Sequence, residues 1–309
     1  MASILVTGGA GFIGSHLCER LVKGGYDVVC LDNFDDYYSP RIKKANIRGL
    51  DCKLVRVDIR DYGKVKAAVG KAKPDYIIHE AAQAGVRASV VNPLKTNEVN
   101  VNGTLNLLEA AKDAGLKKFV FASSSSIYGK IHHLPFDEEH PKNPISQYGV
   151  SKLACEHYLR VYGELFGLKS VALRYFTVYG PRIRPDLAIH KFTKTALEGG
   201  KLQVYGDGSK SRDFTYVTDA VDATVKALKK GSGVYNVGGG TVISVKELAE
   251  RIIGQVGSGS IKYVADQKGD VEHTMSDTSR ARRELGWKPK VRFEEGLEET
   301  VEWVRGIYS

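Results

Sequence analysis

The chain has 309 residues, and 45 lysines and arginines against 36 aspartates and glutamates give it a formal net charge of +9. Hydrophobic residues make up 42% and charged residues 26% of the chain, which is ordinary globular usage and excludes a disordered or low-complexity protein. The positive residues are spread along the whole chain, which favours a surface suited to anionic small molecules over a nucleic-acid interface.

The sequence shows no feature of a membrane or secreted protein. It contains no run of about 18 apolar residues, so no transmembrane helix is expected. Residues 1–7 lack a basic segment and indicate a first strand, not a signal peptide. The four cysteines (Cys18, Cys30, Cys52 and Cys155) form no CxxC pair, which favours free thiols in a reducing cytosol over disulfides or a zinc site. We expect a cytoplasmic protein with no metal site.

Short apolar segments alternate with helix-like segments through the first half of the chain. Strands rich in Val and Ile are expected at 4–7, 28–31, 54–57, 76–79, 119–122 and 171–174. Helices are expected at 12–23, 62–70, 94–114 and 147–166. This alternation predicts an α/β fold with a doubly wound parallel sheet, Rossmann-like, over residues 1–176.

After residue 177 the alternation ends, and segments with Gly and Pro separate shorter elements. Strands are expected at 203–205, 214–217 and 234–237, and helices at 219–229, 245–256 and 294–305. We interpret 177–309 as mainly a smaller α/β lobe over the carboxyl ends of the sheet, with some segments returning to the first domain.

A glycine-rich turn, residues 8–14, follows the first strand and opens the first helix. Glycines let the backbone approach a pyrophosphate, and the free N–H groups of a helix N-terminus bind it. Asp32 ends the second strand, where a carboxylate accepts hydrogen bonds from an adenosine ribose and repels a 2′-phosphate. The pattern predicts a site for NAD in preference to NADP. Asp58, which ends the third strand, would reach the adenine edge or, equally well, cap the helix that begins near Tyr62.

Tyr148 and Lys152 lie four residues apart, on one face of a predicted helix. The spacing alone is not specific, because Tyr62 and Lys66 repeat it. Position distinguishes the two pairs: the helix of Tyr148 follows the serine-rich end of the fifth strand, residues 123–126. A neighbouring ammonium favours the phenolate form of a tyrosine, so Tyr148 is predicted to act as a general base. The serines would hold the same substrate hydroxyl, or would only form a polar loop at the strand end.

With these motifs the sequence resembles the extended short-chain dehydrogenase/reductase family, and within it the nucleotide-sugar 4-epimerases. The motifs that carry the resemblance lie along essentially the whole chain: TGGAGFIGSH (7–16), LDN (31–33), IIHEAAQAGVRAS (77–89), NVNGT (100–104), FASSSSIYG (121–129), YGVSK (148–152), LRYFTVYGPR (173–182), SRDFTYVTD (211–219), YNVGGG (235–240), GDV (269–271) and LGWKP (285–289).

The resemblance implies roles for individual residues of this chain. The catalytic residues would be Ser124, Tyr148 and Lys152. NAD would be bound by Gly8, Gly11, Phe12, Ile13, Gly14, Asp32, Asn33, Asp58, Ile59, Ala81, Ala82, Asn100, Tyr148, Lys152 and Tyr175. A UDP-sugar would be bound by Gln83, Arg87, Ser124, Ser125, Ser126, Tyr148, Thr177, Arg184, Tyr205, Arg212, Asp270 and Thr274.

Within this set the resemblance assigns Arg212 to the diphosphate, a role that suits a bidentate guanidinium, and Asp270 to the nucleotide ribose. This chain departs from the family at one position: related sequences carry a second arginine for the diphosphate, and this chain has Gln267 there. Lys268 is the candidate substitute. The resemblance also implies a homodimer built from two helices of the sheet domain.

The residues after Ser124 bear on the reaction. Family members that eliminate water or carboxylate carry an acid there, because elimination needs a second proton-transfer group. Ser125 and Ser126 occupy these positions, so we expect a 4-epimerase that acts through a transient 4-keto sugar. A nucleotide-sugar dehydratase and a non-catalytic NAD(H)-sensing protein are more distant alternatives.

The expected substrate is UDP-glucuronate. Segments 83–87 and 177–186 are most similar to UDP-glucuronate 4-epimerases, and Arg184 would meet a C6 carboxylate, unless it is a surface arginine in a proline-bounded turn. Thr274 stands at a pocket position that is a bulky tyrosine in members restricted to UDP-glucose. Its small side chain leaves room for a C6 carboxylate or a C2 N-acetyl group, so UDP-N-acetylglucosamine and UDP-glucose are the alternatives.

Overall fold

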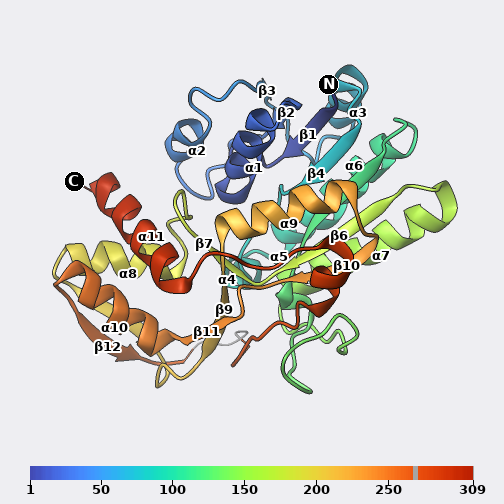
Figure 1. Cartoon of the computed structure of the whole chain (residues 1–309). Coiled ribbons are helices and arrows are strands. Elements are labelled where there is room, and N and C mark those ends of the chain that lie inside the picture. The colour runs from blue at the N-terminus through green and yellow to red at the C-terminus, as the bar shows by residue number, and fades with distance from the viewer. Residues whose placement is uncertain (267–270, 309) are drawn as a thin grey trace.

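The computed structural model describes residues 1–266 and 271–308. Its centre is a sheet of seven parallel strands in the order β10-β6-β5-β4-β1-β2-β3 (Figure 1). The strands are β1 Ser3–Thr7, β2 Asp27–Leu31, β3 Lys53–Val55, β4 Tyr76–His79, β5 Lys118–Ser124, β6 Ser170–Tyr175 and β10 Gly233–Val237. The prediction of a doubly wound parallel sheet is confirmed. The strand order reverses between β1 and β4, and ligands of such sheets bind at this reversal, outside the carboxyl ends of the strands.

Helices cover both faces of this sheet, because alternate strand residues point to opposite sides. Ile4 and Val6 belong to one apolar core, whereas Leu5 belongs to the other. The first core contains residues of α1 Phe12–Lys23 and α9 Val217–Lys229. The second contains residues of α3 Tyr62–Ala72, α6 Gly103–Lys112 and α7 Gln147–Phe166. Both faces are buried, which explains the continuous apolar strands.

The helix expected at 94–114 is found as three consecutive pieces. They are α5 Pro93–Asn97, a π-helical segment Glu98–Asn102 and α6. A π segment widens one helical turn, and such turns occur often at functional sites. Here the wider turn contains Asn100, which is buried.

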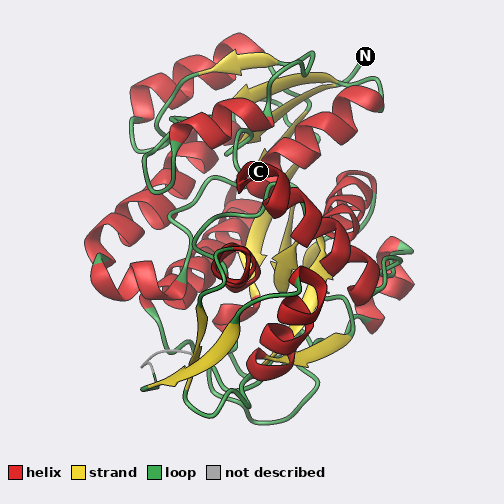
Figure 2. Cartoon of the chain, turned by 90° about the vertical axis from the view of Figure 1, so that its left-hand side faces the viewer, coloured by secondary structure: helices red, strands yellow, loops and turns green. Residues whose placement is uncertain are grey.

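The remaining strands form two small sheets, separate from the central one (Figure 2). One contains β7 Thr177–Tyr179, β9 Ser211–Tyr216 and β11 Thr241–Ser244; the other pairs β8 Lys201–Tyr205 with β12 Ser260–Val264. The helices α8 Ala188–Leu197, α10 Val245–Val256 and α11 Phe293–Tyr308 pack with them. The strand expected at 234–237 lies elsewhere, since β10 pairs with β6 in the central sheet.

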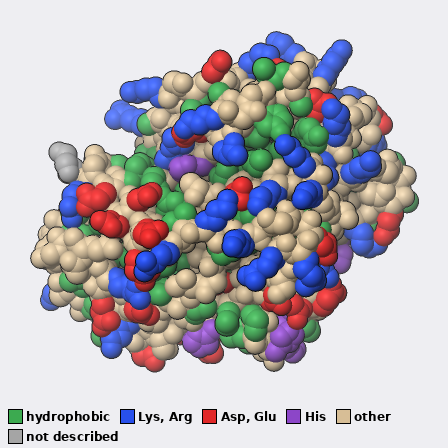
Figure 3. Space-filling view, in the orientation of Figure 1, with side chains coloured by type: hydrophobic (Ala, Val, Ile, Leu, Met, Phe, Trp, Pro, Cys, Tyr) green, Lys and Arg blue, Asp and Glu red, His purple; other side chains and the backbone are tan. Residues whose placement is uncertain are grey.

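The predicted helices at 12–23, 147–166 and 245–256 have the bounds expected. Two short helices near the central sheet, α2 Pro40–Asn46 and α4 Val86–Val91, were not predicted, and neither were β7, β11, β12 and α8. In Figure 3 basic side chains are spread over the visible face with acidic ones among them. Within the described ranges no helix has the length and apolarity needed to cross a membrane.

Candidate active site

The glycine turn lies where the sheet order reverses. Gly8 has φ of +67°, which favours glycine, and a methyl group there would lie 2.7 Å from the amide nitrogen of Ala81. A methyl group on Gly14 would lie 2.1 Å from the carbonyl oxygen of Gly8. These contacts exclude any side chain at either position. The ends of β1 and β4 and the first turn of α1 therefore meet without intervening side chains.

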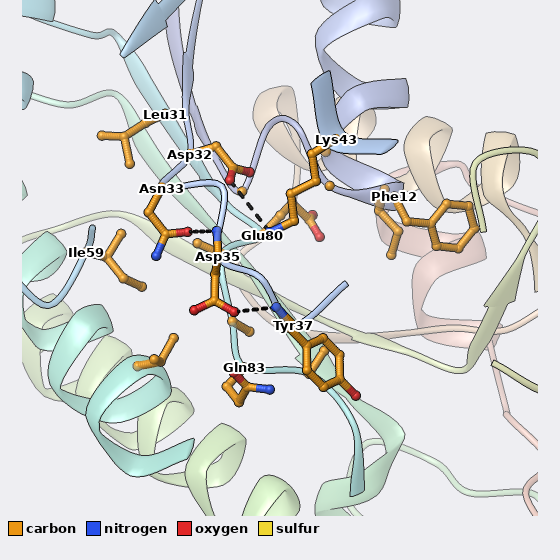
Figure 4. A pocket seen from close by; sticks show the side chains of 18 of the residues that line it. Phe12, Leu31, Asp32, Asn33, Asp35, Tyr37, Lys43, Ile59, Glu80 and Gln83 are labelled. Atoms are coloured by element: carbon orange, nitrogen blue, oxygen red, sulfur yellow. Dashed lines mark hydrogen bonds and ion pairs between the residues drawn. The ribbon is translucent and has the colours of Figure 1, made fainter. Parts of the chain in front are cut away.

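A pocket opens at this point, between the ends of β1, β2 and β4 (Figure 4). Of the residues predicted for the dinucleotide, the following line it: Gly8, Gly11, Phe12, Ile13, Gly14, Asp32, Asn33, Asp58, Ile59, Ala81 and Ala82. Two residues predicted for the substrate, Gln83 and Arg184, also line it. The structure thus brings segments from five parts of the sequence into one cavity.

Asp32 is held rigidly in this pocket. Its carboxylate accepts the backbone amides of Ala10 at 3.1 Å and Phe34 at 2.8 Å. The buried ammonium of Lys43 lies 3.9 Å from the same carboxylate (Figure 4). A fixed carboxylate with remaining lone pairs suits the two hydroxyls of an adenosine ribose.

The pocket also contains an unpaired polar atom. The hydroxyl of Tyr38 is buried, and no described residue or backbone group gives it a hydrogen bond. It points at the glycine turn, 3.8 Å from where a Gly11 side chain would begin, and Lys43 lies over its ring at 5.0 Å. A phosphate at the turn would accept from this hydroxyl and neutralise the ammonium. The residues present therefore fit a dinucleotide pyrophosphate.

Asp58 lies on the far side of this pocket. It accepts from Asn33 Nδ2 at 3.0 Å and from two nitrogens of Arg60, whose hydrogen bonds lower the pKa of Asp58 to about 2. The alternative role as a helix cap is wrong, because Asp61 accepts the Lys64 amide at the start of α3.

The predicted catalytic residues come from the end of β5 and the start of α7. The Lys152 ammonium is buried, donates to the Ala122 carbonyl at 2.7 Å and lies 5.9 Å from the centre of the Tyr148 ring. Ser124 Oγ accepts the Ser126 amide at 3.1 Å. A methyl group on Gly149 would lie 2.4 Å from the Ser126 carbonyl oxygen, so this glycine lets the helix start pack directly on the serine turn. Tyr148 is thereby placed beside the predicted serines.

Asn100 and Tyr175 do not line the pocket but hydrogen-bond to residues that do. Asn100 accepts the Gln83 amide at 2.7 Å and donates to the Gln83 carbonyl and to the Ser151 hydroxyl. It therefore joins the segment after β4 to helix α7. The Tyr175 hydroxyl contacts Glu80, a pocket residue that was not predicted.

Several of the residues predicted for the UDP-sugar lie on β9 or beside it. Thr177 opens β7 opposite Phe214 of β9. Arg212 donates to the Ser211 carbonyl, and buried Thr274 accepts the Asp213 amide at 3.1 Å. Arg87 of α4 lies 4.5 Å above the Tyr205 ring of β8, which joins the sheet domain to the small sheets. Asp270, Gln267 and Lys268 lie outside the described residues.

Arg184 belongs to the cofactor side of the site. Its guanidinium forms a two-pronged ion pair with Asp186 at 2.9 Å, and the Tyr37 hydroxyl donates to the same carboxylate. Only 18% of its side chain is exposed, so the alternative of a surface arginine is wrong. Arg184 also lines the dinucleotide pocket.

Several residues of the site were missed, among them Tyr37, Tyr38, Lys43, Glu80 and Asp186. A usable signal existed for three of them, because Tyr37, Tyr38 and Lys43 follow shortly after Asp32 and precede the third apolar segment, at 54–57. Glu80 stands within the quoted motif at 77–89. Among the residues with described positions, no group of three or more His, Cys, Asp or Glu side chains is arranged to hold a metal ion.

Comparison with known proteins agrees with this geometry. The family model for GDP-mannose 4,6 dehydratase matches residues 5–300. A UDP-glucuronate 4-epimerase of Thermodesulfobacterium geofontis is 40% identical, and the alignment covers 98% of this chain and 96% of the relative.

Two solved structures superpose on this chain with a TM-score of 0.94. Each superposition covers 99% of this chain and 100% of the solved chain. One is a UDP-glucose 4-epimerase of Thermotoga maritima with UDP-glucose, at 37% identity. The other is a UDP-glucuronic acid 4-epimerase of Bacillus cereus with UDP-glucuronic acid and NAD, at 36% identity. Sequence, fold and site together show that the chain belongs to the extended short-chain dehydrogenase/reductase family, among its NAD-dependent nucleotide-sugar epimerases.

Proposed function

We propose that this chain binds NAD and inverts C4 of a UDP-sugar, with UDP-glucuronate as the favoured substrate. The observation that carries the proposal is the packing of the Tyr148 helix on the Ser124–Ser126 turn, at the same sheet edge as the dinucleotide pocket. Asp32 would hold the adenosine ribose, and the glycine turn with Tyr38 would hold the pyrophosphate. Such packing brings a base, a hydroxyl and a cofactor site to one place.

The residues of this chain supply proton transfer and position. Tyr148 removes the proton from the C4 hydroxyl, while Ser124 hydrogen-bonds to the same oxygen. Bound NAD supplies a reversible acceptor for the C4 hydride. Lys152 is fixed by the Ala122 carbonyl and keeps its positive charge near the tyrosine ring. The 4-keto sugar, held through its nucleotide, presents its other face. The hydride returns to C4 on that face and Tyr148 returns the proton to O4, so C4 is inverted.

The serine turn favours epimerisation over elimination, although the matching family model carries a dehydratase name. Elimination needs an acid that can act at C5 or on the leaving hydroxyl. The two positions after Ser124 are hydroxyls in a short 3₁₀ turn, Ser125–Ile127, and cannot serve as that acid near neutral pH. This observation supports a reaction that ends at the oxidation level where it began.

Two features support UDP-glucuronate among the possible sugars. Arg184 contacts Asp186 through Nε and Nη2, which leaves Nη1 to meet a substrate carboxylate. Thr274 is smaller than a tyrosine, and its hydroxyl accepts the Asp213 amide, so the side chain would leave room for a substituent on the sugar. The same space would accept a C2 N-acetyl group, which keeps UDP-N-acetylglucosamine and UDP-glucose as alternatives.

The test compares kcat/KM for the three UDP-sugars in the wild type, Arg184→Ala and Arg182→Ala. Arg182 is the matched control, because it lies in the same loop and pairs with Glu19 of α1. An arginine that binds the carboxylate predicts a selective loss on UDP-glucuronate in Arg184→Ala alone. An equal loss on all three sugars would assign Arg184 to the diphosphate. Near wild-type epimerase activity in Tyr148→Phe would contradict the catalytic assignment.

We also propose a homodimer that associates through α4, α5 and α7. Apolar side chains on these helices are exposed: Val91 by 85%, Leu94 by 76% and Val150 by 53%. These three helices pack against one another, and exposed apolar side chains gathered on neighbouring elements mark an association site. Sedimentation of the wild type and of a Val91→Lys, Leu94→Glu double variant tests the proposal: the wild type should be a dimer and the variant a monomer.

We place the protein in the cytoplasm. Cys18, Cys30, Cys52 and Cys155 are free thiols, and three of them are buried. This state supports a reducing compartment. Fractionation of the source cells followed by immunodetection would test the location.

A further inference from the structure

Glu80 is a carboxyl group inside the dinucleotide pocket that the proposed reaction does not use. It follows the last residue of β4 and lines the pocket together with the glycine turn (Figure 4). Its backbone touches that turn, since a side chain on Gly8 would begin 2.9 Å from the Glu80 carbonyl carbon. A phosphate bound at the turn would therefore be a close neighbour of this residue.

The hydrogen bonds around Glu80 can be counted. The Tyr175 hydroxyl lies 3.0 Å from Glu80 Oε1 and 2.6 Å from Thr224 Oγ1, and Thr224 Oγ1 donates to the Ala220 carbonyl at 2.8 Å. These three contacts need three hydrogens, but the two hydroxyls carry only two. The carbonyl oxygen and an ionised carboxylate only accept.

A proton on Glu80 completes the chain of contacts. Thr224 then donates to Ala220, Tyr175 donates to Thr224, and Glu80 donates to the oxygen of Tyr175. The chain runs in one direction from the pocket to helix α9, and every contact has its hydrogen. An ionised Glu80 would leave one of the three contacts between two oxygen atoms without a proton.

The charges around the group agree with a neutral carboxyl. Burial raises the pKa of Glu80 to about 7, against the opposing effects of the Tyr175 hydroxyl and the Lys152 ammonium of α7. Helix α9 contributes only the Thr224 hydroxyl. On the same strand, His79 is engaged by the hydroxyls of Thr7 and Thr104, and burial holds its pKa well below the ordinary value.

The opposite wall of the pocket carries the remaining charges. Asp32 and Lys43 form one pair, and Arg184 is paired with Asp186. The charges of the opposite wall are thus paired with one another, and Lys152 is the cation that opposes a neutral Glu80. Two phosphate charges beside a carboxyl group favour its neutral form.

We propose that Glu80 is a neutral, protonated acid when NAD is bound. Binding of NAD then takes up one proton and fixes the Tyr175 hydroxyl beside the cofactor. The inference rests on the proposed binding of NAD. Glu80 is a positioning residue: it acts through Tyr175 and has no role in proton transfer to the sugar. Affinity for NAD should fall about tenfold for each pH unit above neutrality, because the ionised form must first gain a proton.

The experiment titrates nucleotide-stripped full-length protein with NAD by calorimetry, above neutral pH, in two buffers with different heats of ionisation. The wild type should take up close to one proton for each NAD bound. Glu80→Gln keeps the size of the side chain, offers N–H donors and carries no charge, so it should take up none and should bind NAD more tightly than the wild type there.

Glu138→Gln is the matched control. Glu138 is a buried carboxyl whose pKa is likewise raised by burial, but it accepts the Asn236 backbone amide on β10 and does not line the pocket. This variant should show the proton uptake of the wild type. The wild-type measurement stands by itself if a variant fails to fold.

Two results would overturn the inference alone: wild-type NAD binding without proton uptake, or weaker NAD binding by Glu80→Gln at every pH, which would show an ionised Glu80 supported by Lys152. Absence of NAD binding by the wild type at any pH would overturn the proposed cofactor together with the inference. The outcomes are therefore distinguishable.

Discussion

Replacing Gly149 by alanine tests whether the contact between α7 and the serine turn sets the catalytic geometry. The added methyl group would lie 2.4 Å from the Ser126 carbonyl oxygen and 2.9 Å from Pro144 Cβ, whereas ordinary contacts begin at 3.4 Å. The start of α7 must therefore move by about 1 Å relative to the turn. A misplacement of about 1 Å can cost about 100-fold in rate, so we expect kcat to fall by about that factor.

The cofactor should stay bound in this variant, because the glycine turn joins β1 to α1 and Asp32 directly follows β2, away from α7. The assay combines the initial rate of C4 inversion, followed by the UDP-sugar product, with the NAD content of the purified protein. Gly163→Ala is the control, since it lies in the same helix and its methyl group would meet only the Leu168 carbonyl at 3.4 Å. Both variants gain about 1 kcal/mol of helix propensity. A wild-type rate in Gly149→Ala would refute the reasoning.

Two further substitutions test the cofactor site and the support of the reaction centre. Asp32→Ala removes the acceptor for the ribose and releases Lys43, so NAD retention should weaken and the preference over NADP should shrink; competition between the two nucleotides measures both, and NADP in the isolated wild type would contradict the assignment. Arg174→Met breaks a buried ion pair with Glu156 at 2.8 Å, in which the two side chains are 3% and 7% exposed. The free energy of unfolding in urea should fall by about 3–5 kcal/mol, because an unpaired charge stays buried. A double variant with Glu156→Gln should recover part of that loss, and equal losses in the single and double variants would show that the charge is not the cause.

The sequence by itself predicted the parallel sheet and the glycine turn. Both depend on local patterns: strands buried on two faces are apolar throughout, and a helix has a period of 3.6 residues. The bounds of α1, α7 and α10 agree with the prediction for that reason. Helix α8 has the same signal in Ile189, Phe192 and Ala196, and it was overlooked.

Strands that carry little local signal were not predicted. Most residues of β12 are exposed or half-buried, and β7 has three residues, so neither has a useful alternation of apolar and polar positions. The place of β10 in the central sheet was also beyond local reasoning, because it depends on pairing with β6, about sixty residues earlier in the chain.

Side-chain partnerships were decided only by the tertiary structure. Tyr38 reaches the glycine turn, Arg184 pairs with Asp186 beside Tyr37, and Glu80 meets Tyr175 and Thr224. Glu80 and Tyr175 are 95 residues apart in the chain. They meet because the carboxyl ends of parallel strands share one edge of the sheet, and helix α9 covers that edge from a distant part of the sequence. A residue type at one position specifies the chemistry it can perform, but burial and the choice of partner depend on the packing of the whole domain.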